Sequence, residues 1–172
     1  MSQIALLRGI NVGGRNKLPM KTLIMLIEAL GGKNVRTYIQ SGNVAYDGQL
    51  SAADITAAIK EHVGFAPRVF VISAEAFRKA VGANPFGKEA AASGKTVHLF
   101  LLDGDPAPAD LDALLNLKRP TEDFALVGQA LYLHTPNGLS SSAVAEKIDR
   151  ILKVETTARN WNTVTKLLEM TT

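Results

Sequence analysis

The order of apolar segments in the first half of the chain constrains the fold more than any other feature. A short apolar run at residues 3–8 precedes an amphipathic stretch that begins at Pro19, a favourable first position of a helix. Two strand-like runs follow at residues 34–40 and 43–47, joined by a tight turn. A second amphipathic stretch then leads to the strand-like run at residues 68–73. The sequence therefore predicts strand, helix, strand, strand, helix, strand, which is a ferredoxin-like plan.

Turn and capping residues set the expected limits of these two helices. The first helix carries its apolar residues on one stripe and is stopped by Gly31. Ser51 and Asp54 resemble a capping box at the start of the second helix, which Gly64 ends. Both helices therefore have ends that are encoded locally.

The same order begins again in the second half of the chain. We expect a strand at residues 96–103, a helix at residues 109–117, and a hairpin around Gly128 and Gln129. Two helices are expected after the hairpin, the last of them standing where the plan has its final strand. The turn-rich segment 84–95, with its small residues, is the expected link between the halves.

We therefore predict an α+β protein of two tandem ferredoxin-like (βαββαβ-type) subdomains. Their sheets are antiparallel or mixed, and the second subdomain ends in helices. The predicted limits are residues 1–83 for the N-terminal subdomain, 84–95 for the linker, and 96–172 for the C-terminal α+β subdomain.

Composition narrows the chemistry. The chain of 172 residues is 47% hydrophobic and 20% charged, which is typical of a soluble globular protein. It has no cysteine, which excludes disulfides, cysteine–zinc sites and thiol nucleophiles. The three histidines lie far apart in the sequence, so we expect no metal site, and no motif requires a cofactor. The N-terminus has neither a basic leader nor a long apolar run, which predicts a cytoplasmic protein with no membrane partner.

The predicted strand order brings one basic segment close to one polar turn. In a ferredoxin-like sheet the carboxyl end of the first strand, the hairpin after the second strand and the entry to the fourth strand meet at the same edge. Residues 8–17 should therefore lie beside residues 40–43 and near Arg68, whereas Lys33 and Arg36 fall at the opposite edge. Basic residues strongly outnumber acidic ones before residue 46. Such a charge asymmetry suits an anionic partner, and the alternative, which charge alone favours, is a solvated face on which basic residues cluster by chance.

The glycine-rich segment in that basic run has the glycine spacing of a phosphate loop without its chemistry. Gly9 and Gly14 are correctly spaced, but Arg15 and Asn16 stand where lysine and serine or threonine are required. A looser anion site remains possible, because glycine lets backbone N–H groups approach a ligand and arginine grips phosphate or carboxylate with two hydrogen bonds. The alternative is that the glycines only supply positive φ and that Arg8 pairs with a carboxylate. The sequence leaves both open.

The sequence gives less support to RNA binding by base stacking and to catalysis by a histidine–serine pair. RNA-recognition modules stack bases on aromatic residues of the first and third strands, and here the third strand offers only Tyr46. His98 and His134 lie in expected strands with no serine placed to act as a nucleophile. An enzyme acting on a phosphorylated small molecule stays an alternative, as does a protein-interaction domain without a ligand.

The C-terminal segment adds a second basic group. Thr157 is expected to cap the last helix, which would put Arg159 and Asn160 in its first turn, where an anion is favoured. Trp161 begins the apolar face of that helix. The alternative is a helix whose tryptophan only anchors the core.

Three motifs, ALLRGINVGGRNKLPM, RTYIQSGNVAYD and TARNWNTVTKLLEM, carry a family resemblance. The chain resembles the bacterial proteins grouped as domain of unknown function 1697. The resemblance implies tandem ferredoxin-like subdomains in a small cytoplasmic protein, and it implies no established activity. One departure is that residues 139–142 read Leu-Ser-Ser-Ser, where the family usually has a glycine and a basic residue.

We therefore expect a binding module for a phosphate- or carboxylate-bearing ligand, either an anionic small molecule or the backbone of a nucleic acid. No catalytic residue is assigned, and the oligomeric state is left open. The candidate ligand-binding residues are Arg8, Gly9, Asn11, Gly13, Gly14, Arg15, Lys17, Gln40, Ser41, Asn43, Arg159, Asn160 and Trp161.

Overall fold

The computed structural model describes residues 1–172, which form two compact units. Unit 1 comprises Met1–Lys79 together with Thr165–Thr172, and unit 2 comprises Ala80–Val164. Each unit holds one four-stranded sheet, so the two tandem ferredoxin-like subdomains predicted from the sequence are confirmed as a fold. None of the helices has both the length and the apolar character needed to cross a membrane.

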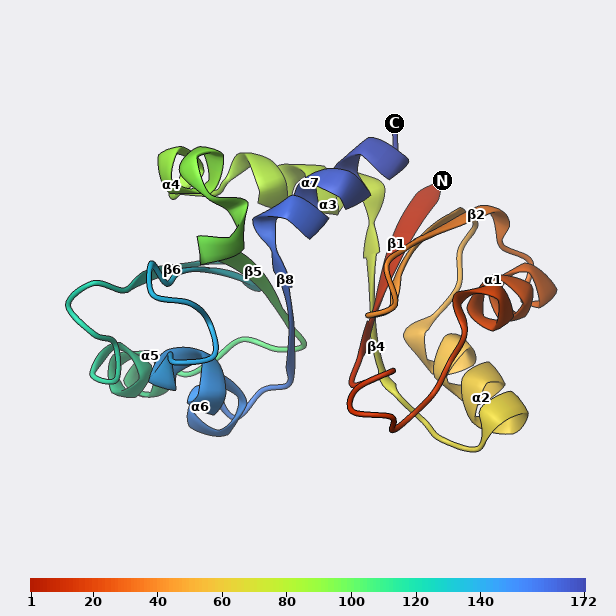
Figure 1. Ribbon diagram of the computed structural model, residues 1–172, viewed down its shortest axis with the longest axis horizontal. Coiled ribbons are helices and arrows are strands. Elements are labelled where there is room, and N and C mark those ends of the chain that lie inside the picture. Colours follow the sequence, from red (N-terminus) through yellow and green to blue (C-terminus); the bar gives the residue numbers. More distant parts are fainter. The chain divides into compact units, whose positions relative to one another are not determined.

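The sheet of unit 1 follows the predicted plan. Its strands are β1 (Ser2–Arg8), β2 (Lys33–Tyr38), β3 (Asn43–Asp47) and β4 (Arg68–Ser73), in the spatial order β2-β3-β1-β4. Every neighbouring pair is antiparallel. Helices α1 (Met20–Ala29) and α2 (Ala52–Val63) cover one face of this sheet (Figure 1).

The core of unit 1 lies between that sheet face and the two helices. Ala5 and Leu7 of β1 alternate with the residues of the other face, and they pack with Leu23 and Ile27 of α1 and with Ile55 and other residues of α2. The helix limits are those that the sequence encodes: the Ser51 hydroxyl accepts a hydrogen bond from the backbone N–H of Asp54 (3.0 Å), and Gly64 ends α2 with φ +87°.

Unit 2 repeats this architecture after three short helical segments. These are α3 (Ala74–Gly82), which begins in unit 1, α4 (Gly87–Ala92) and a 3₁₀ turn, η1 (Gly94–Thr96). The sheet then orders β5 (Val97–Leu102), β6 (Asp123–Val127), β7 (Ala130–His134) and β8 (Thr156–Asn160) as β6-β7-β5-β8. Helices α5 (Pro108–Leu115) and α6 (Ala143–Leu152) pack their apolar residues against Phe100, Leu102, Leu131 and Leu133.

The end of unit 2 differs from the expectation of a helix in place of the last strand. Residues 156–160 form β8, which pairs antiparallel with β5, and the last helix α7 (Trp161–Met170) begins only afterwards. Thr156 and Thr157 are β-branched and favour a strand, and β5 would otherwise present an unpaired edge. The segment 84–95, expected as a link, contains α4 and η1.

The last residues of the chain belong to unit 1 rather than to unit 2. The guanidinium of Arg36, on β2, donates a hydrogen bond to the carbonyl of Met170 in α7. Unit 1 is therefore discontinuous in sequence, whereas unit 2 is a single continuous segment.

Candidate functional site

One end of the sheet of unit 1 collects the segments that the sequence placed together. Arg8, the last residue of β1, lies opposite Arg68, the first residue of β4, and the N–H of Leu7 donates to the carbonyl of Gly42 (2.9 Å). The amide of Asn11 donates to the carbonyl of Gln40 (2.8 Å). The predicted arrangement of these strands is confirmed, and we call residues 8–18 together with residues 39–43 the basic edge.

The glycine-rich segment of the basic edge is a small hairpin and not a phosphate loop. The N–H of Arg15 donates to the carbonyl of Val12 (2.9 Å), and the N–H of Asn11 donates to the carbonyl of Asn16 (3.0 Å). Gly13 and Gly14 form the turn with φ +57° and +75°, and this pair of positive φ angles defines a type I′ turn. Two of the backbone N–H groups that a phosphate loop would offer to a ligand are thus used within the hairpin.

Asparagine side chains fix this hairpin to its surroundings. The amide of Asn11 donates to the carbonyls of Leu18 (2.9 Å) and Gln40, and its oxygen accepts from the N–H of Leu18 (2.8 Å). The amide of Asn16 donates to the carbonyl of Gly9 (3.1 Å). Both asparagines have positive φ, which this residue type tolerates well. The role of Asn11, proposed from sequence as a ligand-binding residue, is in this structure the cross-link between hairpin and turn.

The neighbouring turn, residues 39–42, is equally constrained. Asn43 is fully buried, and its amide donates to the carbonyl of Tyr38 (2.9 Å) and to the hydroxyl of Ser41 (3.0 Å). A Cβ added to Gly42 would lie 2.7 Å from Cβ of Leu7, so this glycine is needed for the close approach of the turn to β1. Gln40 and Ser41 remain exposed.

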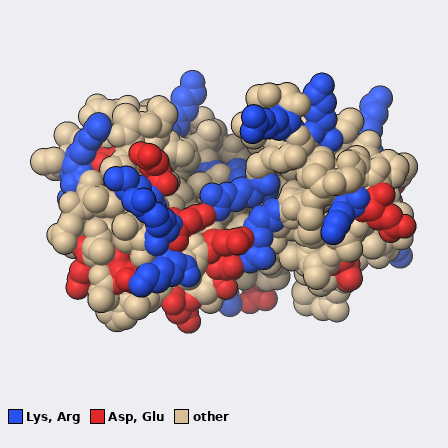
Figure 2. Space-filling model, turned by 90° about the horizontal axis from the view of Figure 1, so that it is seen from below, with Lys and Arg blue, Asp and Glu red and all other residues tan.

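Two basic side chains of the hairpin point into solvent. Arg15 and Lys17 are exposed, and neither forms an ion pair. Arg8 and Gly9 are exposed as well, and the guanidinium of the neighbouring Arg68 lies 5.2 Å from the ring centre of Phe70. Figure 2 shows one face of the molecule, on which basic and acidic side chains are interspersed.

The C-terminal candidates lie in unit 2, and their local structure corrects the prediction. Arg159 and Asn160 belong to β8 and not to the first turn of a helix. The cap of α7 is Asn160, whose side-chain oxygen accepts from the N–H of Thr163 (3.0 Å), and Thr157 is not the cap. Trp161 lies 6.5 Å from the ring of Tyr132, centre to centre.

Arg159 is held within its own strand. Its guanidinium donates to the hydroxyl of Thr157 (3.0 Å) and to the carbonyl of Ala158 (2.8 Å). Burial lowers the pKa of Arg159 to about 10, because a charged guanidinium is disfavoured away from water. Arg159, Asn160 and Trp161 thus fall in a different compact unit from the basic edge.

Two exposed apolar residues of the basic edge were missed by sequence reasoning. Val12 is 63% exposed and Ile39 is 52% exposed, although both are β-branched residues that usually pack. Ile39 also has φ +51°. Val12 could have been noticed because it immediately precedes the Gly13–Gly14 turn, whereas no local signal marks Ile39.

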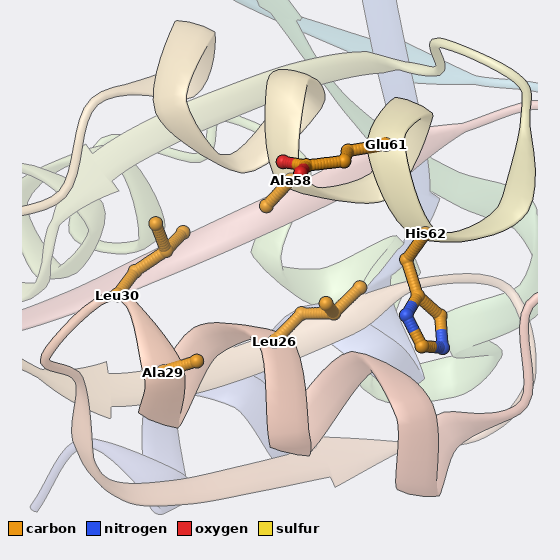
Figure 3. Close-up of a pocket in the computed structure, with 6 residues that line it drawn as sticks. All are labelled: Leu26, Ala29, Leu30, Ala58, Glu61 and His62. Carbon is orange, nitrogen blue, oxygen red and sulfur yellow. The ribbon is translucent and has the colours of Figure 1, made fainter.

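Each unit also has a hollow away from the basic edge. In unit 1 a groove of about 440 Å³ lies between α1 and α2. Figure 3 shows the side chains of Leu26 in α1 and of Leu30 just after it extending toward α2, and the His62 ring extending from α2 toward α1. In unit 2 a hollow of about 490 Å³ is lined by Asp103, Asp149, Arg150, Lys153, Val154 and Glu155.

The carboxylates of the unit 2 hollow have structural roles at the start of β8. Asp149 accepts the hydroxyl of Thr156 (2.6 Å), and Asp103 accepts the N–H of Glu155 (2.9 Å). No group of three or more histidine or carboxylate side chains in the chain is placed to hold a metal ion.

Comparison with known proteins identifies relatives without an assigned activity. Residues 1–132 match the family described as a protein of unknown function (DUF1697). A solved structure of the conserved bacterial protein SP0830 from Streptococcus pneumoniae is similar in fold, with a TM-score of 0.72 and 22% sequence identity over 99% of this chain and 98% of that chain. No curated protein matches the chain.

Proposed function

Because the chain belongs to the DUF1697 family, from which no activity follows, we propose from its own residues that it is a binding module for an anionic group. The ligand carries phosphate or carboxylate and is bound at the basic edge. The observation that carries the proposal is the pair Arg15 and Lys17, two exposed cations without an ion pair on a hairpin that hydrogen bonds hold in place.

The rigid hairpin supports binding because little order has to be gained when a ligand arrives. Asn11 makes three hydrogen bonds that fix the hairpin to Leu18 and to the turn at Gln40. Immobilising a free loop on binding would subtract from the affinity. An arginine and a lysine held on a fixed backbone therefore retain more of the attraction to an anion.

The composition of the basic edge favours binding over acid–base catalysis. Residues 8–18 and 39–43 include no aspartate, glutamate or histidine. A general base for chemistry on a phosphorylated substrate would have to come from outside these segments. The side-chain amides of Asn11 and Asn43 are already used in hydrogen bonds to the backbone. We also propose a cytoplasmic location, since a chain without cysteine needs no oxidising compartment to form disulfides.

The test uses inorganic tripolyphosphate and a glutamate pentapeptide as probes, titrated by calorimetry. Arg15→Ala and Lys17→Ala are each expected to weaken binding by about threefold to fivefold, the range of a single exposed ion pair. Lys33→Ala, at the opposite edge of the same sheet, is the matched control and should leave the affinity unchanged. Affinity should also fall as salt rises.

Two results would contradict the proposal. One is the absence of binding of either probe to the unmodified protein. The other is an equal loss with Lys33→Ala and with Arg15→Ala, which would mean that general surface charge attracts the probes rather than the hairpin.

A further inference from the structure

The most unusual feature of the basic edge is a pair of exposed aliphatic side chains at its two turns. Val12 precedes the hairpin turn, and Ile39 begins the turn between β2 and β3. The two segments are joined next to these residues, because the amide of Asn11 donates to the carbonyl of Gln40 at 2.8 Å. At 63% and 52% exposure, each residue offers at least half of its surface to a partner.

The backbone of Ile39 is strained, and the packing of its half-exposed side chain does little to offset that strain. Its φ of +51° lies in the left-handed region, which a β-branched residue rarely adopts. The other residues of the basic edge with positive φ are glycine or asparagine, the types suited to that conformation. Since half of the Ile39 side chain is exposed, the fold gains little from isoleucine here. Strained residues of this kind mark functional surfaces.

The surroundings of this pair indicate what would cover it. Arg15 pairs with Val12 across the hairpin turn, and the exposed Lys17 follows on the same hairpin, so the aliphatic surface at Val12 has cations beside it. A nucleic acid backbone offers phosphates but no aliphatic surface, and base stacking needs exposed aromatic rings. Tyr46, the aromatic residue of β3, is buried. A polypeptide can supply both an anion and an apolar side chain.

We propose that the basic edge docks an acidic segment of a partner protein, which seats a large apolar side chain against Val12 and Ile39. The inference rests on the proposed function and specifies its ligand as carboxylate-bearing and polypeptide. Acidic residues on either side of the apolar one face Arg15 and Lys17. The apolar contact supplies affinity by removing aliphatic surface from water, and the charges orient the segment.

The experiment compares two synthetic heptapeptides in binding to the full chain. One has a central phenylalanine between glutamates, and the other has alanine in its place. The unmodified protein is expected to bind the phenylalanine peptide at least about fivefold more tightly, a modest share of the value of a buried aromatic side chain. The variant Val12→Ser/Ile39→Asn should lose this preference and still bind the alanine peptide.

The variants separate this inference from the proposed function. Arg15→Ala/Lys17→Ala should weaken the binding of both peptides, whereas Val12→Ser/Ile39→Asn should affect only the phenylalanine peptide. Equal affinity of the unmodified protein for the two peptides would overturn the docking proposal and leave the anion site standing. Undiminished binding of both peptides by the Arg15→Ala/Lys17→Ala protein would overturn the anion site.

A single-stranded oligonucleotide is the third probe. Tighter binding of the oligonucleotide than of the phenylalanine peptide at the same salt concentration would overturn the polypeptide partner in favour of nucleic acid. Ile39→Asn suits the left-handed backbone, and circular dichroism establishes that the variant is folded. If the double variant does not fold, the single variant Ile39→Gly tests the same contact with the same expected loss of preference.

Discussion

The two units share one topology but finish the same end of the sheet in opposite ways. In unit 1 Arg8, at the end of β1, lies opposite Arg68, at the start of β4. At the corresponding place in unit 2, Asp103 follows β5 and Glu155 precedes β8, and their backbones are joined by a hydrogen bond of 3.0 Å. The fold therefore accepts either sign of charge at this end.

The connections at this end differ even more. In unit 1, residues 9–19 lead from β1 to α1 and include a hairpin of their own. In unit 2, residues 103–107 make the same connection from β5 to α5, a length that is ordinary between a strand and a helix. Because the short connection completes the fold in unit 2, the hairpin of unit 1 is not needed to close the chain. That excess supports a role in binding.

The largest expected effect tests how tightly the turns of the two units are packed. Gly42→Ala should cost about 2–4 kcal/mol of unfolding free energy, since the new Cβ would lie 2.7 Å from Leu7 and φ is +89°. Gly128→Ala in the corresponding turn of unit 2, where φ is +61° and a Cβ meets nothing within 4 Å, should cost about 1 kcal/mol. Urea unfolding measures the loss of stability in both variants, and equal losses would contradict a difference in packing between the two turns.

Acid should destabilise unit 2 more than unit 1, because unit 2 contains a buried histidine. Burial lowers the pKa of His98, in β5, to about 4 from the ordinary 6.5. Between these values the unfolded chain takes up a proton that the folded chain does not. The stability of unit 2 is therefore complete above pH 6.5 and falls as the pH drops toward 4, by at most about 3 kcal/mol.

Hydrogen exchange at pH 7 and at pH 5 measures this loss separately in each unit. His98→Leu should flatten the dependence in unit 2. His62→Gln, at an exposed position of α2 in unit 1, is the matched control and should change nothing. Equal acid sensitivity of both units in the unmodified protein, retained in His98→Leu, would show that other groups are responsible.

The cross-link of the hairpin should have a smaller effect. Asn11→Ala removes three hydrogen bonds and is expected to cost about 2 kcal/mol. In unit 2 the comparable link, from the amide of Gln129 to the carboxylate of Asp105, is exposed and 3.4 Å long, so Gln129→Ala should cost under about 0.5 kcal/mol. Thermal unfolding compares the two, and a loss at Asn11 as small as at Gln129 would refute the anchoring role.

The smallest expected effect has the opposite sign. Ile39→Asn should stabilise the unbound protein by about 1 kcal/mol, because asparagine tolerates the left-handed conformation that isoleucine resists. Val127 has similar exposure (51%) but an ordinary strand backbone, and Val127→Asn should be slightly destabilising. Melting temperatures decide, and destabilisation by both substitutions would remove the argument from strain.

Sequence reasoning predicted the sheet of unit 1 and therefore the position of residues 40–43 beside the glycine-rich segment. It succeeded because the helix ends at Ser51 and Gly64 and the apolar strands are local signals, and because strand order follows from element order. The strand β8 was missed altogether and a helix was expected in its place, since its pairing with β5 depends on contacts between residues far apart in the chain.

Within the candidate site, the sequence predicted the backbone conformation of the glycines better than the roles of the polar side chains. Glycines in the hairpin suggested either ligand contact or positive φ, and the structure has positive φ at Gly9, Gly13 and Gly14. Asn11 was proposed as a ligand-binding residue because it belongs to the first of the motifs that carry the family resemblance. Its three internal hydrogen bonds, to Leu18 and Gln40, are set by the tertiary packing of two turns, which no sequence pattern encodes. The left-handed conformation of Ile39 is one that isoleucine disfavours, so the sequence could not predict it.

The membership of residues 165–172 in unit 1 has a consequence for biosynthesis. The first 79 residues leave the ribosome early, but the carbonyl of Met170 that Arg36 binds is made 134 residues after Arg36. Unit 2, being continuous, has all its residues once Val164 has been made. Unit 1 thus starts first but is completed only after unit 2: its four strands are made early, and until residues 165–172 emerge it lacks the end of α7 that Arg36 binds.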